Sequence, residues 1–181
     1  MAGEIKAALD KNTKKKMPRA AMEAHIQKLF QQVRMASLST TDGKKPRATP
    51  LEYFVDGMTI FISPDPGVKM RNIRVNQNVS LSITNATRID WEKQWDKVWA
   101  MQITGTAEVI VHGNPEWDHG RDVIDVASFQ RALGMSATGI SPKRTVLRIP
   151  ISKVELWDYA LLHQGYTYRQ VWQPVGARPE R

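Results

Sequence analysis

The chain has 181 residues, a length typical of a single domain with a substantial hydrophobic core. It contains no cysteine, which excludes disulfide bonds, thiolate nucleophiles and cysteine-ligated metals and fits a reducing compartment. No apolar run approaches the roughly 18 residues that a membrane-spanning helix needs, and the first residues lack the apolar segment of a secretory signal. We therefore expect a cytoplasmic protein that does not enter the membrane.

The net charge of +8 is unevenly distributed along the chain. Half of the excess lies in residues 1–19, where six lysines and arginines outnumber two acidic residues. We interpret residues 1–17 as a basic N-terminal arm, and a terminal run of this kind is usually a solvated tail. Nucleic-acid binding is the alternative, but it rests on this arm alone, so we do not expect nucleic acid to be the partner.

The first part of the chain predicts one helix and then a series of hairpins. Apolar residues recur every three or four positions between Pro18 and Arg34, which is typical of an amphipathic helix. The pattern then alternates, and the pairs Asp42-Gly43 and Asp56-Gly57 predict tight turns. We therefore expect antiparallel strands in meander order over residues 35–40, 46–55 and 58–63.

The remainder adds a short helix, further strands and a second helical stretch. Pro66-Gly67 precedes a basic segment that predicts a helix ending near Asn76. Asn114 as the N-cap, Pro115 at the first helical position and Gly134 as the stop predict one helix over 114–133. Strands are expected over 78–85, 98–111, 144–149 and 151–159, with Pro150 separating or bending the last two.

These elements amount to an α+β protein, mainly β, with a small antiparallel barrel. Closing the barrel would also remove exposed strand edges. We expect one domain over residues 18–181, in which the segment after the last strand forms a C-terminal extension.

The segment that follows Ser63 has the residues of a phosphate site. Lys69 and Arg71 come just after the Pro-Gly turn, so main-chain N–H groups and cationic side chains can converge on a phosphate there. Ser63 can add a hydroxyl group. Solvated surface cations are the alternative interpretation. The chain has neither the GxGxxG nor the GxxxxGK[ST] loop of the common nucleotide sites.

Metal chemistry and a protein-borne nucleophile find little support. His112 and His119 lie seven residues apart, and no HExxH or HxH spacing occurs, so no metal site is expected. There is no GxSxG motif, and no catalytic residue can be assigned. If the protein is an enzyme, the reactive atom belongs to a cofactor.

Six sequence blocks follow one another over about residues 30–112. They are Ala36-Ser37-Leu38-Ser39-Thr40-Thr41-Asp42-Gly43, Pro46-Arg47-Ala48-Thr49-Pro50-Leu51, Thr59-Ile60-Phe61-Ile62-Ser63, Lys69-Met70-Arg71-Asn72-Ile73, Asn76-Gln77-Asn78-Val79-Ser80-Leu81 and Ile103-Thr104-Gly105-Thr106-Ala107-Glu108. No single block is specific, but their order and spacing resemble the FMN-binding split β-barrel superfamily of pyridoxamine 5′-phosphate oxidase.

The resemblance implies a split antiparallel β-barrel with flanking helices and a homodimer that binds two FMN molecules at the subunit interface. In such proteins the flavin lies along the strand that matches Arg47–Leu51, beside the strand end that matches Phe61–Ser63, and Lys69 matches the lysine that holds the phosphate. The cofactor-binding residues implied are Arg47, Ala48, Thr49, Pro50, Leu51, Phe61, Ile62, Ser63, Val68, Lys69, Arg71, Trp157 and Arg169.

Three departures from the family pattern bear on the function. The phosphate turn usually reads Ser-Arg-Lys and here reads Gly67-Val68-Lys69, so a hydroxyl and a guanidinium are missing, and Arg47 or Arg71 would have to compensate. Trp157 and Arg169 resemble the closing Trp and Arg that cover the cofactor from the partner subunit, but they stand further apart. The rest of the oxidase's substrate signature is not evident, and we do not expect oxidation of pyridoxamine phosphate.

The leading interpretation is a flavin-dependent oxidoreductase that acts on a small-molecule substrate, with FMN doing the chemistry. The first alternative uses the deazaflavin F420, whose longer anionic tail would suit Lys14, Lys15 and Lys16. The second is a haem-binding or flavin-storing protein without turnover. Its axial haem ligand would come from one of four histidines, His25, His112, His119 or His163.

Overall fold

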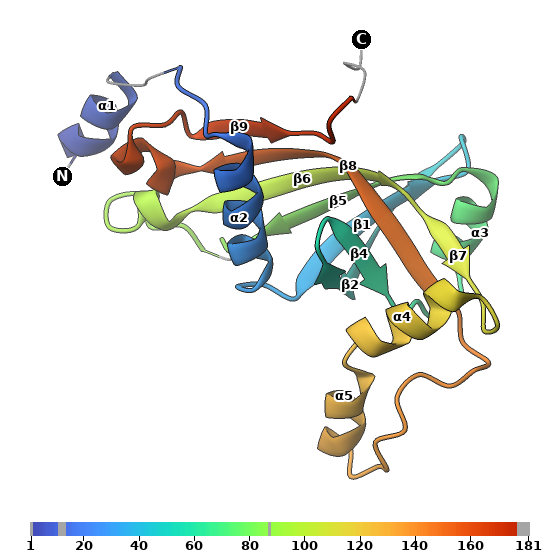
Figure 1. The fold of residues 1–181 in the computed structure, drawn as a ribbon. Coiled ribbons are helices and arrows are strands. Elements are labelled where there is room, and N and C mark those ends of the chain that lie inside the picture. The colour runs from blue at the N-terminus through green and yellow to red at the C-terminus, as the bar shows by residue number, and fades with distance from the viewer. Residues whose placement is uncertain (1, 11–13, 87, 177–181) are drawn as a thin grey trace. The chain divides into compact units, whose positions relative to one another are not determined.

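The computed structural model describes residues 2–10, 14–86 and 88–176. Its helices are α1 (Ala2–Asp10), α2 (Arg19–Phe30), α3 (Val68–Val75), α4 (Pro115–Val123) and α5 (Val126–Ala132), with 3-10 turns η1 (Trp95–Lys97) and η2 (Tyr159–Gln164) (Figure 1). Its strands are β1 (Met35–Thr41), β2 (Pro46–Glu52), β3 (Phe54–Asp56), β4 (Thr59–Ile62), β5 (Asn78–Thr84), β6 (Trp99–Thr106), β7 (Glu108–Ile110), β8 (Val146–Asp158) and β9 (Arg169–Trp172). None of the described helices has the length and apolar character needed to cross a bilayer.

The strands form one sheet in the order β2-β1-β5-β6-β8-β4-β3, and β7 and β9 each pair with β8. The pairs β1–β2, β3–β4, β4–β8, β7–β8 and β8–β9 are antiparallel. β8 is the longest strand at 13 residues and pairs with β4, β7 and β9 along its length. The predicted fold class is confirmed: the protein is mainly β, a curled antiparallel sheet of the split-barrel kind with a few flanking helices.

Two compact units make up the chain. The terminal unit takes Met1–Val33, Leu81–Ile103 and Ser152–Arg181, and the central unit takes Arg34–Ser80 and Thr104–Ile151. The strands β5, β6 and β8 contribute residues to both units. A single domain over residues 18–181 stays a prediction.

In the terminal unit, α2 buries one face, as its three- and four-residue spacing predicted. Met22, Ile26, Leu29 and Phe30 are buried, and the helix opens with a hydrogen bond from Met22 N to Pro18 O at 2.9 Å. At about 25 cal/mol per Å² of apolar surface, such a stripe contributes several kcal/mol to folding. This face fixes α2 in the core of the unit.

The basic arm contains more structure than a solvated tail. Residues 2–10 form α1, which contacts η2, while residues 1 and 11–13 lie outside the described part of the chain. The side chains of residues 14–16 are exposed, as expected of a basic arm. The main chain there is nevertheless tied down, because Lys15 O accepts a hydrogen bond from Thr167 N at 2.9 Å and Met17 N donates to Gln170 Oε1 at 3.1 Å.

In the central unit the Asp-Gly turns produce the hairpins β1–β2 and β3–β4, but the expected strand over 46–55 is divided. Tyr53 separates β2 from β3, its main-chain N–H donates to Arg34 O at 3.1 Å, and its side chain is buried. Burial also raises the pKa of the Tyr53 hydroxyl. The chain turns inward at this residue, so that β2 pairs with β1 and β3 pairs with β4.

Two further expectations needed correction. The single helix over 114–133 is wrong: Asn114 caps α4 as predicted, but Asp125 caps a second helix by accepting from Ser128 N at 3.1 Å. A separation of the last two strands at Pro150, one of the two outcomes expected there, is also wrong, because β8 runs through this residue. Pro150 occupies the last pair of the β4–β8 ladder, opposite Thr59, where a missing N–H costs little.

At Gly105 of β6, the backbone lies close to β8. A Cβ atom at this position would lie 2.7 Å from both Pro150 O and the Cγ2 atom of Ile149. We expect Gly105→Ala to lower the free energy of unfolding by about 1–3 kcal/mol in urea titrations, because main-chain atoms have little room to move. Gln102→Ala on an exposed site of the same strand should stay within about 0.5 kcal/mol of the parent. Equal midpoints for the two variants would contradict this packing.

Candidate functional site

The candidate site begins with the register of the β1–β2 hairpin. The register pairs Thr40 with Arg47, Leu38 with Thr49 and Ala36 with Leu51. Directly opposed residues of an antiparallel pair project from the same face of the sheet, and Ala36, Leu38 and Thr40 are buried. Arg47, Thr49 and Leu51 therefore share the inner face of the hairpin, where Thr49 and Leu51 are half-buried and Arg47 is exposed. Ala48 and Pro50 project from the other face and are exposed.

Helix α3 packs against the hairpin through a buried polar contact. Asn72 Nδ2 donates to Thr40 Oγ1 at 3.2 Å, and the two residues are 5% and 3% exposed. Lys69 is half-buried and precedes Asn72 and Ile73 by three and four positions, so the three residues lie on one face of the helix. The Lys69 side chain thus begins on the face of α3 that packs against the hairpin.

Two features of this helix–hairpin contact favour an anionic ligand. The Oγ1 atom of Thr49 is buried and has no hydrogen-bond partner among the described residues. Gly67, at the N-cap of α3 with φ = 147°, offers no side chain to cap the N–H groups of the first turn. A hydroxyl, an ammonium group and the positive end of a helix dipole are the donors that a phosphate binds.

Arg71 lies on the other side of α3. Two residues along a helix correspond to a rotation of about 200°, so Arg71 projects almost opposite to Lys69. Arg71 and Arg74 are exposed and line a cavity of about 310 Å³ together with Lys143 and Arg144. The helix therefore separates Lys69 from Arg71, the two cations that the sequence placed in one phosphate site, and Arg47 rather than Arg71 shares a facing surface with Lys69.

The other expected residues of this unit differ in exposure. Phe61 and Ile62 on β4 are each 1% exposed, and Phe61 packs with Trp117 and the rest of an apolar cluster. Their side chains belong to the core. Ser63, directly after β4, is half-buried, and Val68 at the start of α3 is 36% exposed.

The terminal unit holds the last two expected residues, and it places them side by side. Trp157 on β8 pairs with Arg169 on β9. Trp157 is half-buried, and the Arg169 guanidinium lies 5.4 Å from the centre of the Tyr168 ring. Tyr168 in turn stacks on Tyr159 with ring centres 5.0 Å apart. The sequence had not singled out this tyrosine stack, since only the return of β9 along β8 brings the two rings together.

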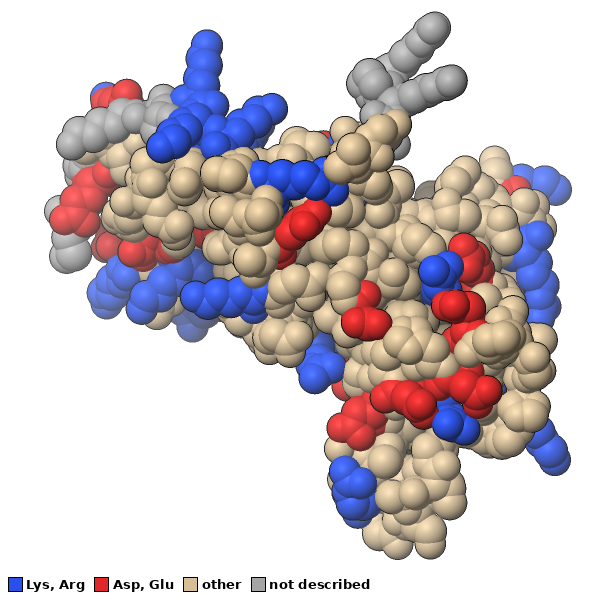
Figure 2. All heavy atoms as spheres, viewed as in Figure 1, with Lys and Arg blue, Asp and Glu red and all other residues tan. Residues whose placement is uncertain are grey.

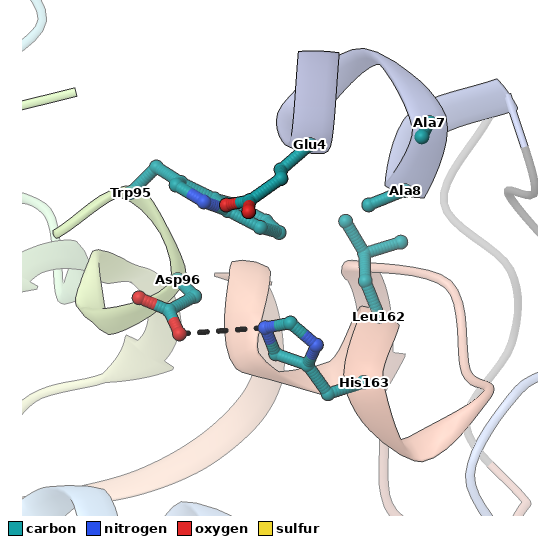
Figure 3. Close-up of a pocket in the computed structure, with 7 residues that line it drawn as sticks. All are labelled: Glu4, Ala7, Ala8, Trp95, Asp96, Leu162 and His163. Carbon is teal, nitrogen blue, oxygen red and sulfur yellow. Dashed lines mark ion pairs between the residues drawn. The ribbon is translucent and has the colours of Figure 1, made fainter. Parts of the chain in front are cut away.

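Each histidine already has a neighbour in its own unit. His25 Nε2 lies 2.7 Å from Asp158 Oδ2, His119 Nε2 lies 3.0 Å from Asp56 Oδ2, and the His112 ring packs edge-on against Trp117. His163 pairs with Asp96 at 3.3 Å on the wall of a cavity of about 420 Å³ in the terminal unit, which Glu4 and Trp95 also line (Figure 3). Within the described residues, no group of three or more His, Asp and Glu side chains could hold a metal ion.

The carboxylate of Asp65, in the loop before α3, interacts with two cations, Arg144 and Lys69. A hydrogen bond from Arg144 Nη2 at 2.8 Å holds the pKa of the Asp65 carboxyl below its usual value, and the charge of Lys69 lowers that pKa further. Lys69 therefore lies within electrostatic range of the loop that precedes α3.

A matched pair of substitutions tests the two threonines of the hairpin. Thr49→Val removes a buried hydroxyl that has no partner, so we expect the free energy of unfolding to stay the same or to rise by up to about 1 kcal/mol. Thr40→Val removes the acceptor of buried Asn72, so we expect a loss of about 1–3 kcal/mol. Urea unfolding of the ligand-free proteins measures both, and a Thr49→Val loss as large as that of Thr40→Val would mean that the Thr49 hydroxyl is bonded within the protein.

Comparison with known proteins identifies the family to which the fold belongs. The family model described as pyridoxamine 5′-phosphate oxidase matches residues 22–158. General stress protein 26 of Bacillus anthracis is similar in structure, with a TM-score of 0.58 and 13% identity over 84% of this chain and 98% of the other. A comparison with curated proteins found no match.

Two more solved structures share the fold while carrying different names. An FAD-binding protein of Mesorhizobium loti has a TM-score of 0.54 and 18% identity over 74% of this chain and 90% of its own. The haem storage protein HutZ of Vibrio cholerae has a TM-score of 0.57 and 14% identity over 75% of this chain and 93% of its own. At these identities the likeness concerns the fold alone.

Proposed function

Because this chain belongs to the pyridoxamine 5′-phosphate oxidase family, we propose that it binds FMN and acts as a flavin-dependent oxidoreductase on a small-molecule substrate. The observation that carries the proposal is the contact of α3 with the hairpin, where the unpartnered Thr49 hydroxyl and the half-buried Lys69 lie on facing surfaces. The donors present there fit a phosphate monoester.

In the proposed site, strand β2 supplies the hydroxyl and the guanidinium that the phosphate turn lacks. Gly67-Val68 removes a hydroxyl and a guanidinium from the usual turn, and Thr49 and Arg47 carry these same two groups on the inner face of β2. Lys69 supplies the ammonium and the α3 N-terminus supplies main-chain N–H groups. The phosphate would thus keep its full set of donors, drawn from two elements instead of one.

FMN, when bound, supplies reversible two-electron redox chemistry. The residues of this chain would bind its phosphate and orient its ring along β2, and we assign no catalytic residue. β2 is the last strand on its side of the sheet, and Ala48 and Pro50 are exposed on its outer face. We propose that a second copy of the chain covers this edge, with Trp157 and Arg169 of the partner subunit closing over the ring.

The described structure favours FMN over the two alternatives. Three of the histidines proposed as haem ligands, His25, His119 and His163, hold an aspartate through Nε2, so binding iron through that nitrogen would require the ion pair to break. The F420 hypothesis depends on residues 14–16 folding over the cofactor, but the main chain beside them is hydrogen-bonded to residues 167 and 170. Neither bond would permit a large movement without being broken.

The absorbance spectrum tests the cofactor. Protein that is purified or reconstituted with FMN and then separated from free flavin should retain two broad bands, one in the near ultraviolet and one in the blue. A sharp Soret band would instead indicate haem, and a single violet band the deazaflavin. Protein that stays colourless after reconstitution would overturn the proposal.

Two cations on opposite sides of α3 test the phosphate site. Lys69→Ala should weaken FMN binding by tenfold or more, about 1.4 kcal/mol, because an ammonium–phosphate bond is lost. Arg71→Ala removes the same charge from the outer face and should change the affinity by no more than about twofold. Quenching of flavin fluorescence measures both constants, and an equal effect of the two substitutions would place the phosphate elsewhere.

A further inference from the structure

The outer face of α3 borders a cationic cavity that shares Gly67, at the N-terminus of the helix, with the proposed flavin site, while its cationic side chains are not part of that site. The cavity measures about 310 Å³, and its cationic side chains are Arg71 and Arg74 of α3 and Lys143 and Arg144 of the loop before β8. Thr145 adds a hydroxyl group to the lining. All of these residues belong to the central unit.

Most of this charge is unpaired. No carboxylate lines the cavity, and among the described residues Arg71, Arg74 and Lys143 have no ion-pair partner, although Arg144 has Asp65. Four like charges around one cavity repel one another, so their arrangement costs free energy until an anion enters.

Other arginines of the same unit do find partners. Arg148 pairs with Glu108 at 2.8 Å and with Glu116 at 3.0 Å, and Arg121 of α4 pairs with Asp118 and Asp122. Figure 2 shows acidic side chains gathered over α4. Arg71, Arg74 and Lys143 differ from Arg148 and Arg121 in that they have no carboxylate partner in the described structure, as is also true of Lys44, Lys45 and Arg47 of the hairpin.

The wall that faces α3 is held in place before any ligand binds. Arg144 Nη2 donates to Asp65 Oδ1 at 2.8 Å, Arg144 N donates to Ser141 O at 2.9 Å, and Arg144 O accepts from the indole N–H of buried Trp117 at 2.9 Å. Pro64 and Pro66 restrict the other edge of the cavity. Such preorganisation lowers the entropic cost of binding.

We propose that this cavity binds a small ligand through two linked phosphate groups. A phosphate carries about −1.5 to −2 charges at neutral pH, so three unpaired cations exceed what one phosphate requires and match a diphosphate. Arg71 and Arg74, one helical turn apart, provide guanidinium forks that bind phosphate oxygens in pairs. A nucleic-acid strand would need an extended basic groove with stacking side chains, whereas this cavity is small and four cations bound it.

Isothermal titration with inorganic pyrophosphate at about 0.15 M ionic strength tests the proposal on the full chain, both as purified and saturated with FMN. We expect binding in both states. The variant R71A/R74A should lose at least about tenfold in affinity, and Lys143→Ala, an exposed loop change, serves as a second variant if the first is poorly folded. The control K28A/K93A removes two exposed lysines from the terminal unit and should bind like the parent.

The outcomes separate this site from the flavin site. Lys69→Ala should leave pyrophosphate binding intact, and ADP should bind about as tightly as pyrophosphate, because the cations would hold only the diphosphate. Competition between FMN and pyrophosphate, or an equal loss in K28A/K93A, would overturn the proposal. So would tight binding of a single-stranded RNA that depends on Arg71 and Arg74 while pyrophosphate fails to bind. The titrations of the protein as purified and of its variants require neither FMN binding nor turnover, so they test this site even if the proposed function fails.

Discussion

The hydrogen bond between Asn72 and Thr40 is the contact on which the central unit depends. It joins two buried side chains, so a rotation of α3 that broke it would leave an amide unsatisfied in the core. Neighbouring positions of a helix are about 100° apart, and fixing Asn72 therefore also fixes which cations face the hairpin. This buried pair, together with the burial of Ile73 on the same face of α3, turns Lys69 inward and Arg71 outward.

Local signals explain how far the fold was predictable. The two Asp-Gly pairs, the alternation of β1 and the Pro-Gly start of α3 are short-range patterns, and each produced the expected element. The division of residues 46–55 at Tyr53 was not predictable, because an aromatic side chain suits a strand as well as a buried corner. Likewise, the sequence alone does not distinguish Asp125 from an ordinary polar residue within a long helix. Its role as an N-cap is evident only in the structure, where its carboxylate accepts a hydrogen bond from Ser128 N. Tertiary packing decided between local alternatives of similar energy.

The sequence predicted which residues belong to the candidate site but not how they are arranged. The resemblance pointed to Lys69 and to strand β2, yet a basic residue at one position of a short helix says nothing about which side the helix turns to the sheet. The cavity that Arg71, Arg74, Lys143 and Arg144 line was missed for a different reason. Arg71 and Lys143 are far apart in the sequence, and only the folded chain brings α3 and the loop before β8 to one cavity. The three-residue spacing of Arg71 and Arg74 was the available signal, although that spacing is common on solvated helices.

Because some of its donors lie on β2, the proposed phosphate site should link two elements of the fold when it binds a phosphate. When one turn carries all the donors to a phosphate, binding of the phosphate orders only that turn. In this protein Thr49 and Arg47 lie on strand β2 and Lys69 lies on helix α3, so one phosphate would join two elements. That bond would act in parallel with the Asn72–Thr40 contact and stabilise the same orientation of α3. Arg71 and Arg74 are carried by the same eight-residue helix as Lys69, so an anion on either side of α3 would favour a single helix position. The two sites would then be coupled through α3 with the same sign in both directions.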